Sequence, residues 1–193
     1  LRKLFFFLTL TNNIGCSIYM STRKMNKIII KDNFLHKDIF NSIKNTIFDA
    51  DVKNVFPWYL QDHKVIKGDN EVQLTHLFYQ PHKPNSDFFD VLNPILNKLN
   101  VRALQRVKAN CTFKTTKKRL YAYHVDIDTP KNEPVGKTSI FYLHTTNGPT
   151  FFKTGKKINC VANRMVTFPT NLEHTGSTHT DNLLRGLINI NWF

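Results

Sequence analysis

Cysteine is scarce in this chain and follows no metal-binding or disulfide pattern. The three cysteines, Cys16, Cys111 and Cys160, form no Cys-x-x-Cys pair and are odd in number. This arrangement argues against a zinc ribbon and against a framework of structural disulfides. We therefore expect a protein of a reducing compartment, and we assign it to the cytoplasm.

Acidic residues are also few. The chain has 14 Asp and Glu against 27 Lys and Arg, which gives a net charge of +13. Such an excess can attract nucleic acid. It is concentrated in two basic runs, at positions 114–119 and 153–157. No aromatic-interleaved nucleic-acid motif accompanies these runs, so we prefer a solvated basic surface as their interpretation.

Long hydrophobic runs are absent from the sequence. The apolar stretch at positions 1–10 is too short to span a membrane, and no Ala-x-Ala-like cleavage site follows it. Positions 25–30 resemble the opening strand of a domain. We expect residues 1–24 to be an extension, disordered or not native, and residues 25–193 to form one domain with no membrane partner.

Glycine and proline number only 7 and 8 and form no linker or repeat, which also favours a single domain. The 41% hydrophobic residues are enough for a sizeable core. Residues 25–100 form a lead-in region of strands and helices. An apolar stripe predicts a helix at 36–50, and a second helix at 86–100 is interrupted at Pro94, which lacks a backbone donor.

Residues 101–193 are rich in short β segments. We expect strands at 101–113, 120–127, 138–145, 150–153, 158–161, 165–168 and 183–192. The dipeptides Asn147-Gly148 and Thr154-Gly155 are turn signals between them. This pattern favours a mainly β fold with a jelly-roll core, a cupin-like double-stranded β-helix, and helices on its outer face.

The pair His124-x-Asp126 is the first candidate for a functional site. Side chains two residues apart on a strand point to the same face, so this imidazole and carboxylate can bind one cation. Two imidazoles and one carboxylate suit Fe(II) and leave coordination positions open. The third ligand must come from elsewhere, and His174 and His179 are the candidates.

Arg185 is the second candidate for a functional residue, and it indicates the kind of molecule that binds near the metal. It stands between Leu183 and Leu187 on one face of the alternating last strand. A buried guanidinium is costly unless an anion meets it, and Arg suits bidentate recognition of a carboxylate. An Arg near a metal site therefore suggests a carboxylate cosubstrate.

These residues resemble the Fe(II)- and 2-oxoglutarate-dependent dioxygenases, in particular their prolyl 4-hydroxylase-like branch. The resemblance covers roughly residues 101–193 and rests on five matching stretches: His124-Val-Asp126, 138–148, 163–169, His174-Thr-Gly176 and Arg185. It implies that His124, Asp126 and His174 bind iron. It also implies that Arg185 and Tyr142 hold the distal carboxylate of 2-oxoglutarate.

The chain departs from the family pattern at two positions. His144 stands where the family often has Asn, and Asn189 stands where the family commonly has a Thr. We therefore assign neither residue a role on the basis of the resemblance. His179 stays open as an alternative third ligand. The His174-Thr-Gly176 context and the longer interval to Arg185 favour His174.

The resemblance implies an oxidoreductase that uses Fe(II), 2-oxoglutarate and O2. It would hydroxylate a prime substrate, a peptidyl proline or a related group, with release of succinate and CO2. Two alternatives stay open: a non-catalytic jelly-roll binding module, and a nucleic-acid-directed oxidative demethylase, for which the basic runs are the motive. The sequence does not specify whether the prime substrate is a protein side chain or a small molecule.

Overall fold

Two antiparallel sheets form the centre of the protein. The computed structural model describes residues 27–49, 55–69, 71–130 and 133–193, so the expected extension at 1–24 lies outside the described residues. In chain order the elements are β1 (Ile29–Lys31), α2 (Lys37–Phe48), β2 (Tyr59–Gln61), β3 (Gln73–Gln80), β4 (Lys83–Pro84), the 3-10 helix η1 (Phe89–Leu92), α3 (Asn93–Leu99), β5 (Leu104–Phe113), β6 (Lys137–Tyr142), β7 (Thr146–Phe152), β8 (Lys157–Cys160), β9 (Met165–Pro169), β10 (His174–Gly176) and β11 (Leu184–Trp192).

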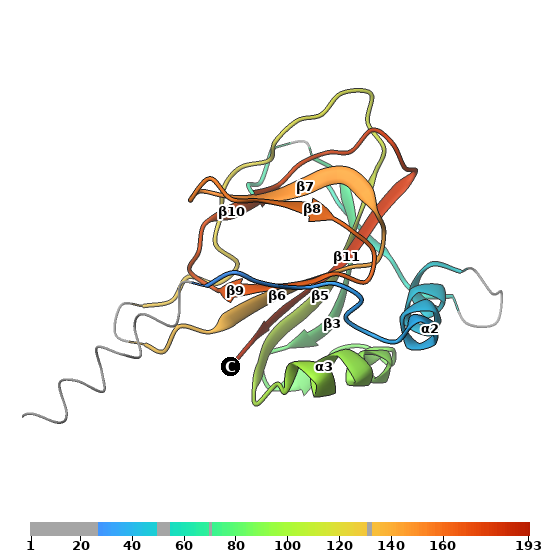
Figure 1. Ribbon diagram of the computed structural model, residues 1–193, viewed down its shortest axis with the longest axis vertical. Helices are drawn as coiled ribbons and strands as arrows, with labels where there is room; N and C mark the ends of the chain where they lie inside the picture. The colour runs from blue at the N-terminus through green and yellow to red at the C-terminus, as the bar shows by residue number, and fades with distance from the viewer. Residues whose placement is uncertain (1–26, 50–54, 70, 131–132) are drawn as a thin grey trace, which may run out of the picture.

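The larger sheet has the strand order β1-β9-β6-β11-β5-β3-β2, with β4 paired to β3. The smaller sheet has the order β10-β7-β8. Figure 1 shows the smaller sheet lying across one face of the larger one, while α2 and α3 lie on the opposite side. The expectation of a mainly β, jelly-roll fold with flanking helices is confirmed.

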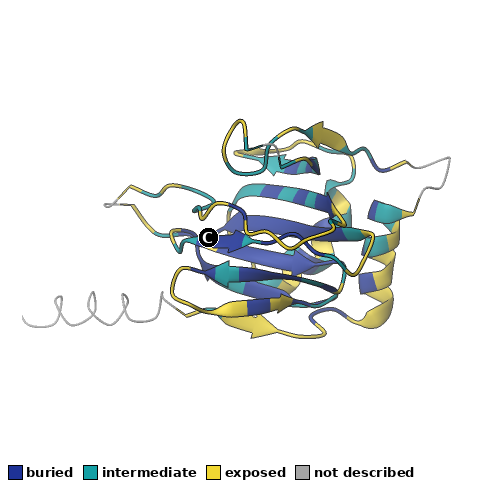
Figure 2. Ribbon diagram, turned by 90° about the horizontal axis from the view of Figure 1, so that it is seen from above, coloured by how far each residue is buried: buried dark blue, intermediate teal, exposed yellow. Residues whose placement is uncertain are grey.

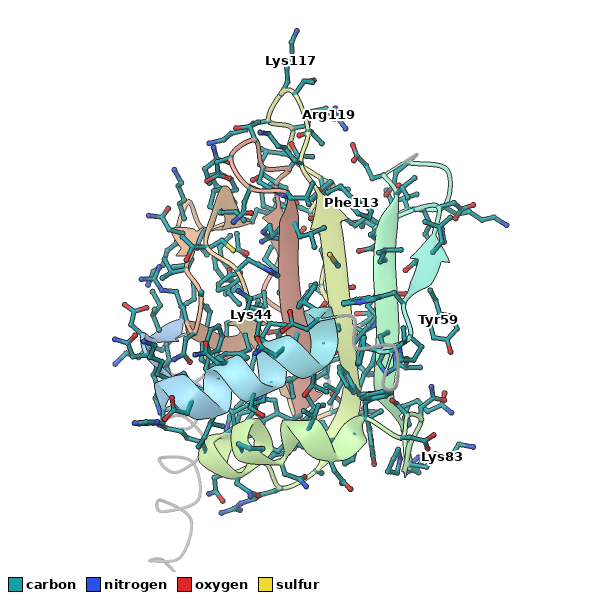
Figure 3. All side chains as sticks on the ribbon, turned by 90° about the vertical axis from the view of Figure 1, so that its right-hand side faces the viewer. Lys44, Tyr59, Lys83, Phe113, Lys117 and Arg119 are labelled. Carbon is teal, nitrogen blue, oxygen red and sulfur yellow. The ribbon has the colours of Figure 1, made fainter. Side chains whose placement is uncertain are left out.

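Each face of the larger sheet has its own apolar core, because strand side chains alternate between the faces. On the helix side, Ile43 and Ile95 pack with Ile188 of β11. Between the sheets, Phe152 packs with Leu187, the neighbour of Ile188 along the strand. Figure 2 shows the central strands buried, and Figure 3 shows the two helices crossing the sheet.

The helices follow the apolar periodicity of the sequence. In α2, Phe40, Ile43 and Ile47 are buried at helical spacing. Pro94 lies in the first turn of α3, where its missing N–H is not needed, and this separates η1 from α3 as expected. Asn100 then ends α3 with φ 55° in the left-handed region.

Two expectations about the β segments are wrong. Residues 120–127 form no continuous strand and pair only through isolated bridges, Leu120 with Ser177 and His124 with His174. Gly148 is not at a turn but inside β7, where a Cβ would lie 3.0 Å from the Cβ of His179. Glycine is required there by close packing, not by a reversal of the chain.

The helices offer no candidate for a membrane segment. Within the residues described, none combines the length and the hydrophobicity needed to cross a bilayer.

Candidate metal centre

His124 and His174 face each other directly across an isolated antiparallel bridge. Each backbone N–H donates to the other residue's carbonyl at 3.0 Å. Opposed residues of an antiparallel pair present their side chains on the same face, and the two ring centroids lie 4.7 Å apart. The bridge therefore brings together two imidazoles that are far apart in the sequence.

Asp126 completes the cluster. One ligand atom from each of His124, Asp126 and His174 lies within 4.8 Å of the others. The Nε2 atoms of His124 and His174 lie 3.9 and 3.7 Å from the carboxylate oxygens. Their Nδ1 atoms lie 3.3 and 3.1 Å from the carbonyls of Ala122 and Leu172. An Nδ1–H donated to a carbonyl leaves the Nε2 lone pair free for a cation.

The local electrostatics favour the protonation states that a divalent cation needs. Burial lowers the pKa of His124, His174 lowers it further, and Asp126 opposes both. Burial by itself raises the pKa of Asp126, but His174, the amide of Asn189 and the charge of Arg106 outweigh it and lower that pKa. A neutral imidazole and an ionised carboxylate are the ligand forms that bind Fe(II).

Asp126 is held by side chains that the sequence did not reveal as part of the site. The Asn189 amide lies 3.0 Å from each carboxylate oxygen, and one Arg106 N–H donor lies at 3.4 Å. Asn191 adds a longer contact of 3.4 Å. The sequence did contain one signal for Asn189: the alternation of the last strand places it on the same face as Arg185.

Arg185 is 3% exposed and lines the same cavity as the three candidate ligands. Its Nε donates to the carbonyl of Gly148 at 3.0 Å. It forms no ion pair with any carboxylate in the described part of the chain. The planar fork of this guanidinium suits a carboxylate or another anion that enters the cavity.

Tyr142 lies beside Arg185, whose guanidinium carbon is 5.8 Å from the centre of the Tyr142 ring. The Tyr142 hydroxyl shares a 2.7 Å hydrogen bond with Thr150, a residue of the cavity wall. Burial raises the pKa of Tyr142 to about 12 against the effect of Arg185, so the hydroxyl stays protonated at neutral pH.

The cavity itself has a volume of about 90 Å³ and lies between the two sheets. Three further cations line it beside Arg185: Lys64, Arg106 and Lys108. A much larger cavity of about 1000 Å³ shares Arg106 and includes Ile127, the residue after Asp126. The candidate metal ligands line the smaller cavity, and the larger one adjoins it at Arg106.

Two further histidines, His144 and His179, lie outside the cluster although each is near it in the fold or the sequence. His179 is buried and packs its Cβ against Gly148. His144 accepts a hydrogen bond from the N–H of Gly186 at 3.1 Å, and burial lowers its pKa to about 4. The three-residue group contains His174 and not His179.

The two basic runs are partly neutralised by nearby carboxylates. Arg119 contacts Glu71 at 3.2 Å, and Lys153 pairs with Glu173 at 2.8 Å. Lys157 lies 5.9 Å from the centre of the Phe151 ring. These contacts fit a solvated surface.

The chain matches no protein-family model and no curated protein sequence. Its fold is similar to solved structures of 2-oxoglutarate- and iron-dependent oxygenases. A 2OG-Fe(II) oxygenase family protein from Burkholderia pseudomallei has a TM-score of 0.62 at 11% identity, over 95% of this chain and 93% of that one. A Trichoplax adhaerens prolyl hydroxylase, in complex with a hypoxia inducible factor peptide fragment, has a TM-score of 0.60 at 11% identity, over 96% and 94%. The viral collagen prolyl hydroxylase of Paramecium Bursaria Chlorella virus-1, solved with 2OG, has a TM-score of 0.57 at 15% identity, over 85% and 93%.

Proposed function

We propose that this protein is an Fe(II)- and 2-oxoglutarate-dependent oxygenase that hydroxylates a prime substrate. The observation that carries the proposal is one cavity that contains the group His124, Asp126 and His174 together with Arg185. The first three would hold Fe(II), since two imidazoles and a carboxylate leave coordination positions open. His179, outside this group, is not proposed as a ligand.

Arg185 and Tyr142 would hold the distal carboxylate of 2-oxoglutarate. The guanidinium offers a planar fork of donors that matches a carboxylate. The neutral Tyr142 hydroxyl, bonded to Thr150 of the cavity wall, would add a second donor beside Arg185.

Bound iron, 2-oxoglutarate and O2 supply the oxidising chemistry, which converts the cosubstrate to succinate and CO2 and hydroxylates the prime substrate. The protein contributes orientation. The His124–His174 bridge and the Asn189 contacts hold the ligand atoms in place, and Arg185 directs the cosubstrate.

A peptidyl proline or a related group is the prime substrate that we propose. Two proteins of similar fold are prolyl hydroxylases, one of them in complex with a peptide fragment. The cavity of about 1000 Å³ beside Asp126 offers a surface for an extended chain, lined by Leu104, Arg106 and Phe193.

The test is a turnover assay for the Fe(II)-dependent conversion of 2-oxoglutarate to succinate, with peptide, nucleoside and metabolite pools as prime substrates. We expect His124→Ala and Asp126→Ala to abolish succinate formation and to lose metal binding, because each removes a metal ligand. His36→Ala, at an exposed position before α2, is the matched control and should keep full activity.

Retained turnover in either ligand variant would refute the ligand assignment. A wild-type protein that binds Fe(II) yet never consumes 2-oxoglutarate would instead favour a non-catalytic binding module. Turnover that only nucleosides stimulate would redirect the substrate assignment to nucleic acid.

A further inference from the structure

Lys64 reaches the cosubstrate cavity from outside the jelly-roll strands. It lies in the loop between β2 and β3, at positions 62–72. Its Nζ lies 3.6 Å from the centre of the Tyr121 ring, and the residue lines the same cavity as Arg185. Tyr121 and Arg185 both lie next to Gly176. A Cβ added to this glycine would lie 3.5 Å from the Tyr121 ring and 3.8 Å from the Arg185 guanidinium. The Lys64 ammonium is thus at the Arg185 end of the cavity.

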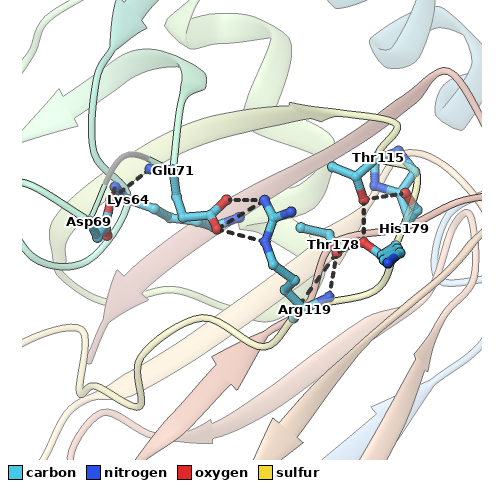
Figure 4. Close-up of polar contacts among 8 residues, drawn as sticks. Lys64, Asp69, Glu71, Thr115, Arg119, Thr178 and His179 are labelled. Atoms are coloured by element: carbon cyan, nitrogen blue, oxygen red, sulfur yellow. Dashed lines mark hydrogen bonds and ion pairs between the residues drawn. The ribbon is translucent and has the colours of Figure 1, made fainter.

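The loop holds Lys64 in this place by a network of hydrogen bonds (Figure 4). The Asp69 carboxylate accepts backbone N–H groups at 2.9–3.2 Å from four loop residues: Lys64, Val65, Ile66 and Glu71. Glu71 in turn accepts two donors of the Arg119 guanidinium at 3.2 Å. The position of Lys64 is therefore built into the fold.

Lys64 and Arg185 are two basic residues that line one cavity, at whose other end lies the carboxylate of Asp126. Within the described segments, neither side chain forms an ion pair with a carboxylate. Burial lowers the pKa of Lys64 well below its usual value and Arg185 lowers it further, although Glu71 and Asp69 act in the opposite direction. Two like charges in one cavity repel each other, and an anion bound between them offsets that repulsion.

We propose that Lys64 is a second cation, beside Arg185, for the distal carboxylate of 2-oxoglutarate. The assignment rests on the proposed function. Lys64 is assigned to the distal end of the cosubstrate because it lies at the Arg185 end of the cavity. The other lysine of the cavity, Lys108, is paired in register with Asn189, which lies beside Asp126.

The lysine side chain suits this role. Its flexible four-carbon stem lets the ammonium adjust its position and keep contact with a bound carboxylate, which a rigid side chain would not.

The test is calorimetric binding of 2-oxoglutarate and of pyruvate to Mn(II)-loaded protein. Pyruvate keeps the oxo acid end but lacks the distal carboxylate. We expect Lys64→Met to weaken 2-oxoglutarate binding about 10-fold or more and to leave pyruvate binding unchanged, because it removes a charge-assisted contact. Lys64→Arg should restore most of the affinity. Lys67→Met, at an exposed position of the same loop, is the matched control.

Unchanged 2-oxoglutarate affinity in Lys64→Met would overturn the proposal. An equal loss for pyruvate would also overturn it, since that result would mean a general effect on the loop, and the thermal unfolding midpoint of each variant checks for one. Failure of the proposed function would give a different result from failure of the Lys64 assignment. In that case the wild-type protein itself would bind neither 2-oxoglutarate nor pyruvate.

Discussion

Asp126 shows how single residues prepare the site. A buried carboxylate normally has a raised pKa, yet this one has a lowered pKa because His174, the amide of Asn189 and the charge of Arg106 together outweigh the effect of burial. The amide of Asn189 lies 3.0 Å from both oxygens, and this fixes the plane of the carboxylate. Residues that orient a ligand in this way commonly contribute to metal affinity as well.

Replacing Asn189 with Ala should therefore weaken Mn(II) or Fe(II) binding by about 10–100-fold, because Asp126 loses its orienting donor. Metal titration followed by calorimetry measures the change. Asn159→Ala, at an exposed position on β8, is the control and should bind metal as the wild type does. Equal affinities in the Asn189 and Asn159 variants would show that Arg106 and Asn191 are sufficient to hold the carboxylate.

At the scale of elements, β11 joins the structural core to the site. Its Ile188 packs under the helices, while Arg185 and Asn189 face the cavity. Gly186 lets α2 approach the strand closely, because a Cβ there would lie 2.3 Å from the Phe48 ring and 3.0 Å from the His144 Nδ1. The contact between the helix and the strand thus depends on a missing side chain.

Gly186→Ala should destabilise the protein by about 1–3 kcal/mol, the usual cost of overpacking a core. Urea unfolding measures the free energy. Combining it with Phe48→Ala should cost less than the sum of the two single changes, because the smaller side chain removes the clash. Strict additivity of the two changes would mean that the Phe48 contact is not the cause.

At the scale of the whole molecule, the candidate ligands come from separate parts of the fold. His124 and Asp126 lie in the long segment between β5 and β6, and His174 begins β10 of the smaller sheet. A metal bound by all three would link that segment to the smaller sheet. Metal binding should therefore stabilise the folded protein.

Mn(II) with 2-oxoglutarate should raise the thermal unfolding midpoint by about 5–10 °C when the free ligand concentration is about 100 times its Kd. That range follows from about 2.7 kcal/mol of ligand stabilisation and roughly 2–4 °C per kcal/mol for a chain of this size. Differential scanning calorimetry measures the shift. The shift should disappear in His174→Ala and persist in His179→Ala, and the reverse pattern would make His179 the third ligand.

Local periodicity was enough to predict much of the fold. The burial of Ile43 and Ile47, the break at Pro94 and the two faces of β11 all follow from side-chain spacing within one element. Ile39 also belongs to the apolar stripe that predicts the first helix, but it is exposed, and Phe40 is buried in its place. His124-x-Asp126 also carried its own signal, because both residues lie within one short stretch. The irregular backbone at 120–127 was not predicted, because alternation in a sequence does not reveal how many partners a strand has.

The amino-acid sequence therefore determined the type of most elements and the residue types available for a metal and an anion. Only the tertiary structure decided that His174 lies opposite His124, that Arg106 contacts Asp126, and that Lys64 lies at the Arg185 end of the cavity. The physical reason is that these contacts depend on strand pairing and loop anchoring. Backbone hydrogen bonds form with little regard to side-chain identity, so no local pattern in the sequence records which distant residues they bring together.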